Sequence, residues 1–223
     1  MVCAGLARLY AQTRRQAVGR ATARGLVVVR DELAWPRDRG AMYWLTMAVA
    51  SLPFDREGDA ERMWSDRFEQ GERWVLEHQV REPPDLGPDD VVGAVDVIAV
   101  KHDEAPYPDW RTSEDLAFLS ARIREGDNSR GATIKRLAAG GMMARYLARL
   151  TFDRPACFYL RNPADAIGGV RLALWDNRLA VQPTAMTLLA ITEFQEAGER
   201  AQDALSRTRQ DGSTKTTHDL PKR

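Results

Sequence analysis

The sequence is poor in the residues that build disulfide frameworks and metal sites. It has two cysteines, Cys3 and Cys157, and three histidines in 223 residues. Cysteines this far apart in sequence provide neither a disulfide framework nor a closely spaced pair of metal ligands. We therefore expect a reducing, cytoplasmic environment, no metal ion and no cofactor.

A long apolar run and an excess of charge are also missing. No window approaches the roughly 18–20 apolar residues of a membrane span, so we do not expect stable membrane insertion. The first residues lack the basic stretch and apolar core of a secretory signal. Basic and acidic residues number 32 each, which gives a formal net charge of zero. This balance gives no reason to expect a nucleic-acid partner.

What is present is apolar residues at helical spacing. Hydrophobic residues make up 44% of the chain, enough for a packed core at this length. We expect one helical domain over residues 1–197. Residues 198–223 are almost entirely polar and are expected to form a disordered tail. The predicted fold class is all-α.

Seven segments are predicted to be helical: 4–30, 41–52, 60–79, 88–100, 113–125, 130–151 and 183–196. Valine runs leave a strand open as the alternative at 25–29 and within 88–100. The adjacent Gly140 and Gly141 leave open a break in the sixth helix. Thr112 and Asp115 resemble a capping box at the start of the fifth.

A nine-residue motif at 71–79 resembles a known family repeat. It reads Gly-Glu-Arg-Trp-Val-Leu-Glu-His-Gln, with an aromatic and an aliphatic residue starting at Trp74 and a glutamine at Gln79. This order is similar to the first half of the QW-type repeat of the squalene cyclase and protein prenyltransferase superfamily. The match ends there, because Pro83 and Asp85 stand where the family has a glycine and a tryptophan.

Two weaker copies of the same unit follow the same order. Residues 145–151 place an aromatic and an aliphatic residue correctly but have Thr151 where the family has glutamine. Paired glycines beginning at Gly168 and the lone Trp175 come next. Near the N-terminus, the stretch from Trp35 through 41–52 resembles the end of another unit.

The resemblance implies an α/α toroid, in which inner helices stand in parallel around a central cavity. The inner helices here would be 41–52, 88–100 and 183–196. The chain supplies fewer helix pairs than a closed toroid of the family. We therefore expect an incomplete arc, which a longer chain or a partner subunit would close.

The family's catalytic motifs are not found in this sequence. Squalene-type cyclases use Asp-x-Asp-Asp, but Gly87 occupies the place of the first aspartate. Asp89 and Asp90 are expected to cap a helix instead. In protein prenyltransferases a zinc-binding histidine falls near the start of the last inner helix, where this chain has Gln182, Pro183 and Thr184. No catalytic residue is assigned.

Four residues are candidates for ligand binding. Trp175 and Asp176 precede an inner helix, where a toroid loop faces the cavity mouth and an indole can contact an apolar group or a cation. Tyr43 and Trp44 lie on the most apolar helix, where they would line the cavity. The alternative for Trp175 and Asp176 is a repeat interface and a turn, and the alternative for Tyr43 and Trp44 is core packing.

The expected function follows from the resemblance. We expect a catalytically divergent helical repeat protein, similar to cyclases and prenyltransferases, that binds an apolar or extended ligand or a partner chain. One alternative is a terpenoid-cyclase-like enzyme whose acid motif is missing or supplied elsewhere. The other is a helical scaffold that works only through protein contacts.

Overall fold

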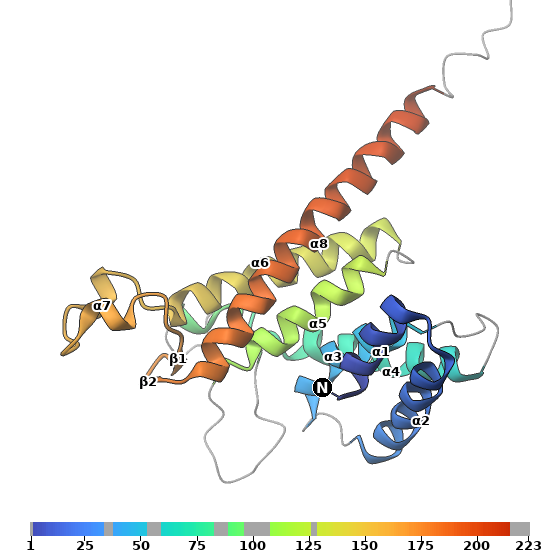
Figure 1. Cartoon of the computed structure of the whole chain (residues 1–223). Helices are drawn as coiled ribbons and strands as arrows, with labels where there is room; N and C mark the ends of the chain where they lie inside the picture. Colours follow the sequence, from blue (N-terminus) through green and yellow to red (C-terminus); the bar gives the residue numbers. More distant parts are fainter. Residues whose placement is uncertain are drawn as a thin grey trace, which may run out of the picture.

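The computed structural model describes residues 2–33, 38–52, 59–82, 89–95, 108–125 and 129–214. These residues are mostly helical, which confirms the all-α class (Figure 1). The α-helices are α1 Val2–Thr13, α2 Gln16–Glu32, α3 Met42–Ala50, α4 Asp59–His78, α5 Thr112–Arg124, α6 Arg130–Leu150, α7 Pro163–Ala166 and α8 Val181–Thr214. Three single turns of 3-10 helix are η1 Arg39–Ala41, η2 Asp89–Val91 and η3 Pro155–Cys157.

Helix α5 is the centre of the core. Every residue from Thr112 to Ile123 except Glu114 is buried, and α3, α6 and α8 pack against it. Burying a polar group without a hydrogen bond costs free energy, and on α5 the Ser113 hydroxyl and Oδ2 of Asp115 have no hydrogen-bond partner among the described residues. The Ser120 hydroxyl has a partner, because it donates a hydrogen bond to the carbonyl of Leu116 within the same helix.

The N-terminal segment differs from the single helix predicted over 4–30. It forms two helices, α1 and α2, which separate at Arg14, whose φ is 53°. The two helices pack against each other, and the Tyr10 ring lies 2.8 Å from the place that a Cβ of Gly19 would take. The strand alternative at 25–29 is wrong, since these residues belong to α2.

Helices α4 and α6 confirm the predictions for 60–79 and 130–151. The predicted apolar face of α4 is buried through Trp64, Phe68 and Val75. Helix α6 continues through its two glycines without a break. The ring of Phe194 packs where a side chain at Gly140 would lie, so tertiary packing compensates for the low helix propensity of glycine.

The helix predicted over 88–100 is wrong for the part that is described. Residues 89–91 form only η2, and Val95 makes an isolated antiparallel bridge with Gln79. Gly93 has a φ of 98°, which is incompatible with a right-handed helix. It also lies so close to the backbone of Met142 that a side chain would not fit. Asp89 and Asp90 therefore cap no long helix here, and residues 96–100 lie outside the described part of the chain.

A small hairpin joins α6 to α8 where the sequence predicted a loop. Strands β1 Arg171–Ala173 and β2 Asp176–Leu179 pair antiparallel. Isolated bridges connect this region to the start of α5, through Asp109 and Ala173, and to the end of α6, through Thr151 and Val170. The hairpin thereby fixes the entry of α8 onto the core.

Helix α8 is longer than the predicted 183–196. It continues to Thr214, and its C-terminal part projects beyond the other helices (Figure 1). Residues 198–214, expected to belong to a disordered tail, are thus helical, and 215–223 lie outside the described residues. Both α3 and α8 pack on α5. The toroid arrangement stays a prediction.

Candidate functional site

A cavity of about 550 Å³ lies between the end of α2, η1 and the start of α5. Its apolar lining comes from Val29, Leu33 and Ala41. Charged side chains, among them Arg39 and Glu114, line the rest. Five of the nine lining residues are charged, so the site offers both apolar contacts and polar groups, and concave sites that combine the two can bind small molecules.

Arg39 is the most unusual residue of this Arg39 cavity. Its side chain is only 5% exposed, and Nη1 lies 3.5 Å from Oδ2 of Asp115, which is 2% exposed. The guanidinium carbon lies 5.7 Å from the centre of the Trp74 ring, within cation–π distance. Within the described part of the chain, neither Nη1 nor Nη2 has a hydrogen-bond partner. The site therefore holds a buried cation whose terminal nitrogens make no hydrogen bond to a described residue, although Nη1 is ion-paired with Oδ2 of Asp115, which also lacks one.

Three carboxyl groups surround this cation. Burial raises the pKa of Asp115 to about 7; Arg39 opposes the shift, and the nearby carboxylates of Glu114 and Asp109 add to it. Burial also raises the pKa of Glu114 and of Asp109 above their ordinary values, against the opposing charges of Arg39 and Arg111. Perturbed carboxyl groups beside a cavity are typical of functional sites.

Asp109 is hydrogen-bonded to Arg111 and does not line the cavity, whereas Glu114 does. Asp109 accepts a hydrogen bond from the backbone N–H of Arg111 at 2.8 Å and another from the Arg111 side chain at 3.0 Å. Glu114 packs against Gly40, where a Cβ would lie 2.6 Å from its Oε2. Arg39 and Glu114 therefore line the cavity, together with the charged residues Glu32, Asp38 and Arg111.

Tyr43 and Trp44, two of the predicted ligand-binding residues, lie on α3. Tyr43 is buried at 3% exposure, and its ring contacts the half-buried Trp44 ring edge to face, with centroids 4.8 Å apart. Burial and the neighbouring Glu193 carboxylate raise the pKa of Tyr43, while Arg124 opposes the shift. Both aromatic rings are part of the main hydrophobic core or packed against it.

Trp175 and Asp176 lie in the hairpin, away from α3 (Figure 1). Trp175 is 49% exposed in the turn between the strands. Asp176 accepts hydrogen bonds from the backbone and side chain of Arg178, and these lower its pKa. The fold thus does not bring the hairpin pair and the α3 pair together into one site.

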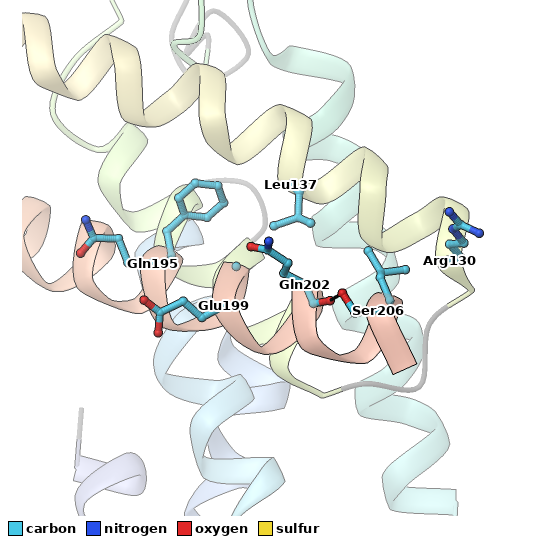
Figure 2. A pocket seen from close by; sticks show the side chains of 9 residues that line it. Arg130, Leu137, Gln195, Glu199, Gln202 and Ser206 are labelled. Atoms are coloured by element: carbon cyan, nitrogen blue, oxygen red, sulfur yellow. Dashed lines mark hydrogen bonds between the residues drawn. The ribbon is translucent and has the colours of Figure 1, made fainter. Parts of the chain in front are cut away.

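A second, larger cavity of about 880 Å³ lies between α6 and α8. Leu137 of α6 faces Gln202 and Ser206 of α8 across it (Figure 2). Its polar lining side chains are all exposed, including Glu199 and Arg130. Exposed groups are already hydrated and gain little from a ligand, so the Arg39 cavity is the stronger candidate.

Sequence reasoning missed Arg39, Glu114 and Asp115. In the segment Asp-Trp-Arg-Thr-Ser-Glu-Asp at 109–115, the sequence pattern predicts only a capping box at Thr112 and Asp115. The capping box is wrong: no side-chain cap bond forms at the start of α5, and the Thr112 hydroxyl accepts a hydrogen bond from the Val95 N–H at 3.2 Å. The only sequence feature that could have indicated this site was the clustering of Asp109, Glu114 and Asp115 around the start of α5.

Comparisons with family models, with curated proteins and with solved structures gave no match. In the part of the chain that is described, no helix combines the length and apolar character needed to cross a membrane. That part also contains no group of three or more histidine, cysteine, aspartate or glutamate side chains arranged to hold a metal ion. The site must therefore be interpreted from its own chemistry.

Proposed function

We propose that this chain is a helical protein, similar to the squalene cyclases and protein prenyltransferases, that binds an apolar ligand carrying an oxygen group in the Arg39 cavity. The observation that carries the proposal is the buried Arg39 guanidinium, with both terminal nitrogens lacking hydrogen-bond partners among the described residues. A buried donor without an acceptor costs free energy. An oxygen atom of a bound ligand would remove this cost once the Arg39 side chain turns toward the cavity, because its two terminal nitrogens are themselves buried.

The charges of the cavity favour a neutral oxygen group. The carboxyl groups of Asp115 and Glu114 already act on the charge of Arg39. A diphosphate would bring further negative charge next to these carboxyls, whereas a hydroxyl, ether or carbonyl group would accept hydrogen bonds without repulsion. Val29, Leu33 and Ala41 would contact the hydrocarbon part.

Thermal unfolding with farnesol and farnesyl diphosphate tests this proposal. We expect farnesol to raise the Tm of the wild type more than farnesyl diphosphate does. Arg39→Met should lose most of this stabilisation. Arg136→Met is the matched control, since Arg136 is an equally buried arginine paired with Glu72 outside the cavity. Arg136→Met should lower the starting Tm but keep the stabilisation by farnesol.

A cavity-filling variant tests the same site without removing a buried charge. Leu33 lines the cavity and is only partly buried, so Leu33→Trp should fill the space and abolish binding while the protein stays folded. The proposal fails if neither compound stabilises the wild type. It also fails if Arg39→Met and Leu33→Trp keep the full effect of farnesol. Stabilisation only by a second protein would support the scaffold alternative.

The second candidate is a cyclase-like enzyme whose acid is not in the family motif. Glu114 favours it, because this carboxyl lines the cavity and burial raises its pKa. A raised pKa keeps a carboxyl group protonated at higher pH, as a general acid requires. Gas chromatography with mass spectrometry of farnesol or squalene incubated with the protein would separate an isomeric product from the substrate of the same mass. Glu114→Gln should then abolish product formation and keep binding.

A further inference from the structure

The first twelve residues of α8, 181–192, include no charged residue. Between Arg178 and Glu193 the sequence contains no aspartate, glutamate, lysine or arginine. A helical segment without charges is normally covered on all faces. The face on α5 is covered, with Thr187 and Ala190 buried. The opposite face is not covered by any described residue: Val181 is 86% exposed and Leu188 69% exposed.

The exposed side chains form one straight ridge. Val181, Ala185, Leu188 and Thr192 are separated by four, three and four residues, the spacing of a single helix face, and all four are exposed. Large and small side chains alternate along this α8 ridge. Each small side chain therefore leaves a depression in the ridge beside a large side chain.

We propose that the α8 ridge docks antiparallel onto the α8 ridge of a second copy of this chain. With the two-fold axis between Met186 and Thr187, Leu188 of one copy lies over Ala185 of the other. Val181 then lies over Thr192, so that each large side chain meets a small one. Such a surface is complementary to itself, which is the requirement for a two-fold interface.

The charges at the ends of the ridge agree with this orientation. Arg178, which is paired with Asp176, precedes the ridge, and Glu196, which lies 3.9 Å from Arg200, follows it; both side chains are more than half exposed and can also reach a second copy. An antiparallel pair brings Arg178 close to Glu196 of the second copy at both ends. A parallel pair would bring like charges together, which opposes association.

The size of the ridge predicts a weak, reversible dimer. The ridge is about 17 Å long at 1.5 Å per residue. A strip this short and one helix face wide buries much less than the roughly 800 Å² that each partner buries in a stable complex. Leu179 and Trp175, which belong to the hairpin that leads into α8, are also exposed apolar residues. This inference is independent of the ligand proposed for the Arg39 cavity.

Sedimentation equilibrium of the full chain tests the dimer. We expect a concentration-dependent dimer for the wild type up to about 100 µM, and a dissociation constant at least about tenfold weaker for Leu188→Glu. Ile134→Glu is the matched control, since Ile134 is an exposed apolar residue on α6. It should leave the dissociation constant unchanged. Circular dichroism would verify that both variants fold.

Cysteine cross-linking tests the register directly. In a Cys3→Ser background, a mixture of Ala185→Cys and Leu188→Cys chains should form a disulfide-linked dimer, whereas Ile134→Cys chains should not. A wild type that stays monomeric at about 100 µM would overturn the proposal. So would a dimer that Leu188→Glu and Ile134→Glu weaken equally. A monomer that binds phosphatidylcholine vesicles through Leu188 would assign the ridge to a lipid surface instead.

Discussion

Nη1 of Arg39 lies 3.5 Å from Oδ2 of Asp115, and both side chains are almost completely buried. The pair connects η1, which enters α3, to the first turn of the central helix α5. An ion pair removed from water must recover its hydration energy through its partners. The attraction of Arg39 does not fully replace the lost hydration of the Asp115 carboxylate, because burial still raises the pKa of Asp115 to about 7.

The raised pKa of Asp115 makes stability depend on pH. Its ordinary value is 3.8, so between that pH and about 7 the folded state keeps a proton that the unfolded state releases. The contribution of Asp115 to the free energy of unfolding should therefore be largest at low pH and fall as pH rises toward 7, by at most about 1.4 kcal/mol per pH unit. Burial also raises the pKa of Asp109 and of Glu114, so their contributions to stability fall with rising pH in the same way. The charge of Arg39 opposes the rise in pKa of all three carboxyl groups.

Urea unfolding of the wild type and Asp115→Asn between pH 4.5 and 7.5 isolates this contribution. The asparagine cannot titrate, so the stability of the wild type relative to Asp115→Asn should decrease steadily as pH rises. A difference between the two proteins that is constant across this range would contradict the burial of an ionisable Asp115.

Glu72 should be essential for stability although it lies outside the Arg39 cavity. Its carboxylate accepts hydrogen bonds from Nε and Nη2 of Arg136 at 2.7 and 2.6 Å, and Arg122 approaches it at 3.5 Å. Glu72→Ala leaves two buried cations without this partner and should cost about 3–5 kcal/mol in urea unfolding. Glu69→Ala, one turn earlier on the exposed face, should change stability by less than about 0.5 kcal/mol.

The adjacent glycines of α6 should respond in opposite ways to alanine. A methyl group at Gly140 would overlap the Phe194 ring of α8, so Gly140→Ala should destabilise by about 1–3 kcal/mol. Gly141 has open space around its Cα, and Gly141→Ala should stabilise by up to about 1 kcal/mol through helix propensity. Two changes of the same sign would mean that α6 and α8 do not cross at Gly140.

Gly93 distinguishes the observed turn from the predicted helix. In a helix over 88–100, Gly93→Ala would stabilise by up to about 1 kcal/mol. In the turn, φ is 98° and the new methyl group would meet the backbone of Met142, so the same change should cost at least about 1 kcal/mol. The sign of the change in urea unfolding decides between them.

The sequence predicted helices wherever apolar periodicity was long, as in α4, α5 and α6. It failed where long-range contacts determine the backbone. The turn at Gly93 depends on Met142, and the hairpin depends on bridges to Asp109 and Thr151. Neither partner is near in sequence, so local patterns carry no trace of it.

The candidate site was less predictable than the fold. Tyr43 and Trp44 were chosen as aromatic residues on an apolar helix, and that helix is mostly core. Arg39 gave no signal, because in sequence it is one of many arginines. Only the fold places it against Trp74 and Asp115 and removes it from water.

Photo-crosslinking with a diazirine analogue of farnesol tests the central claim most directly. Mass spectrometry of the labelled peptides should place the label within 29–33, 38–41 or 111–114, and excess farnesol should suppress it. Label that is confined to other segments, or that farnesol does not compete away, would show that the Arg39 cavity is not a ligand site.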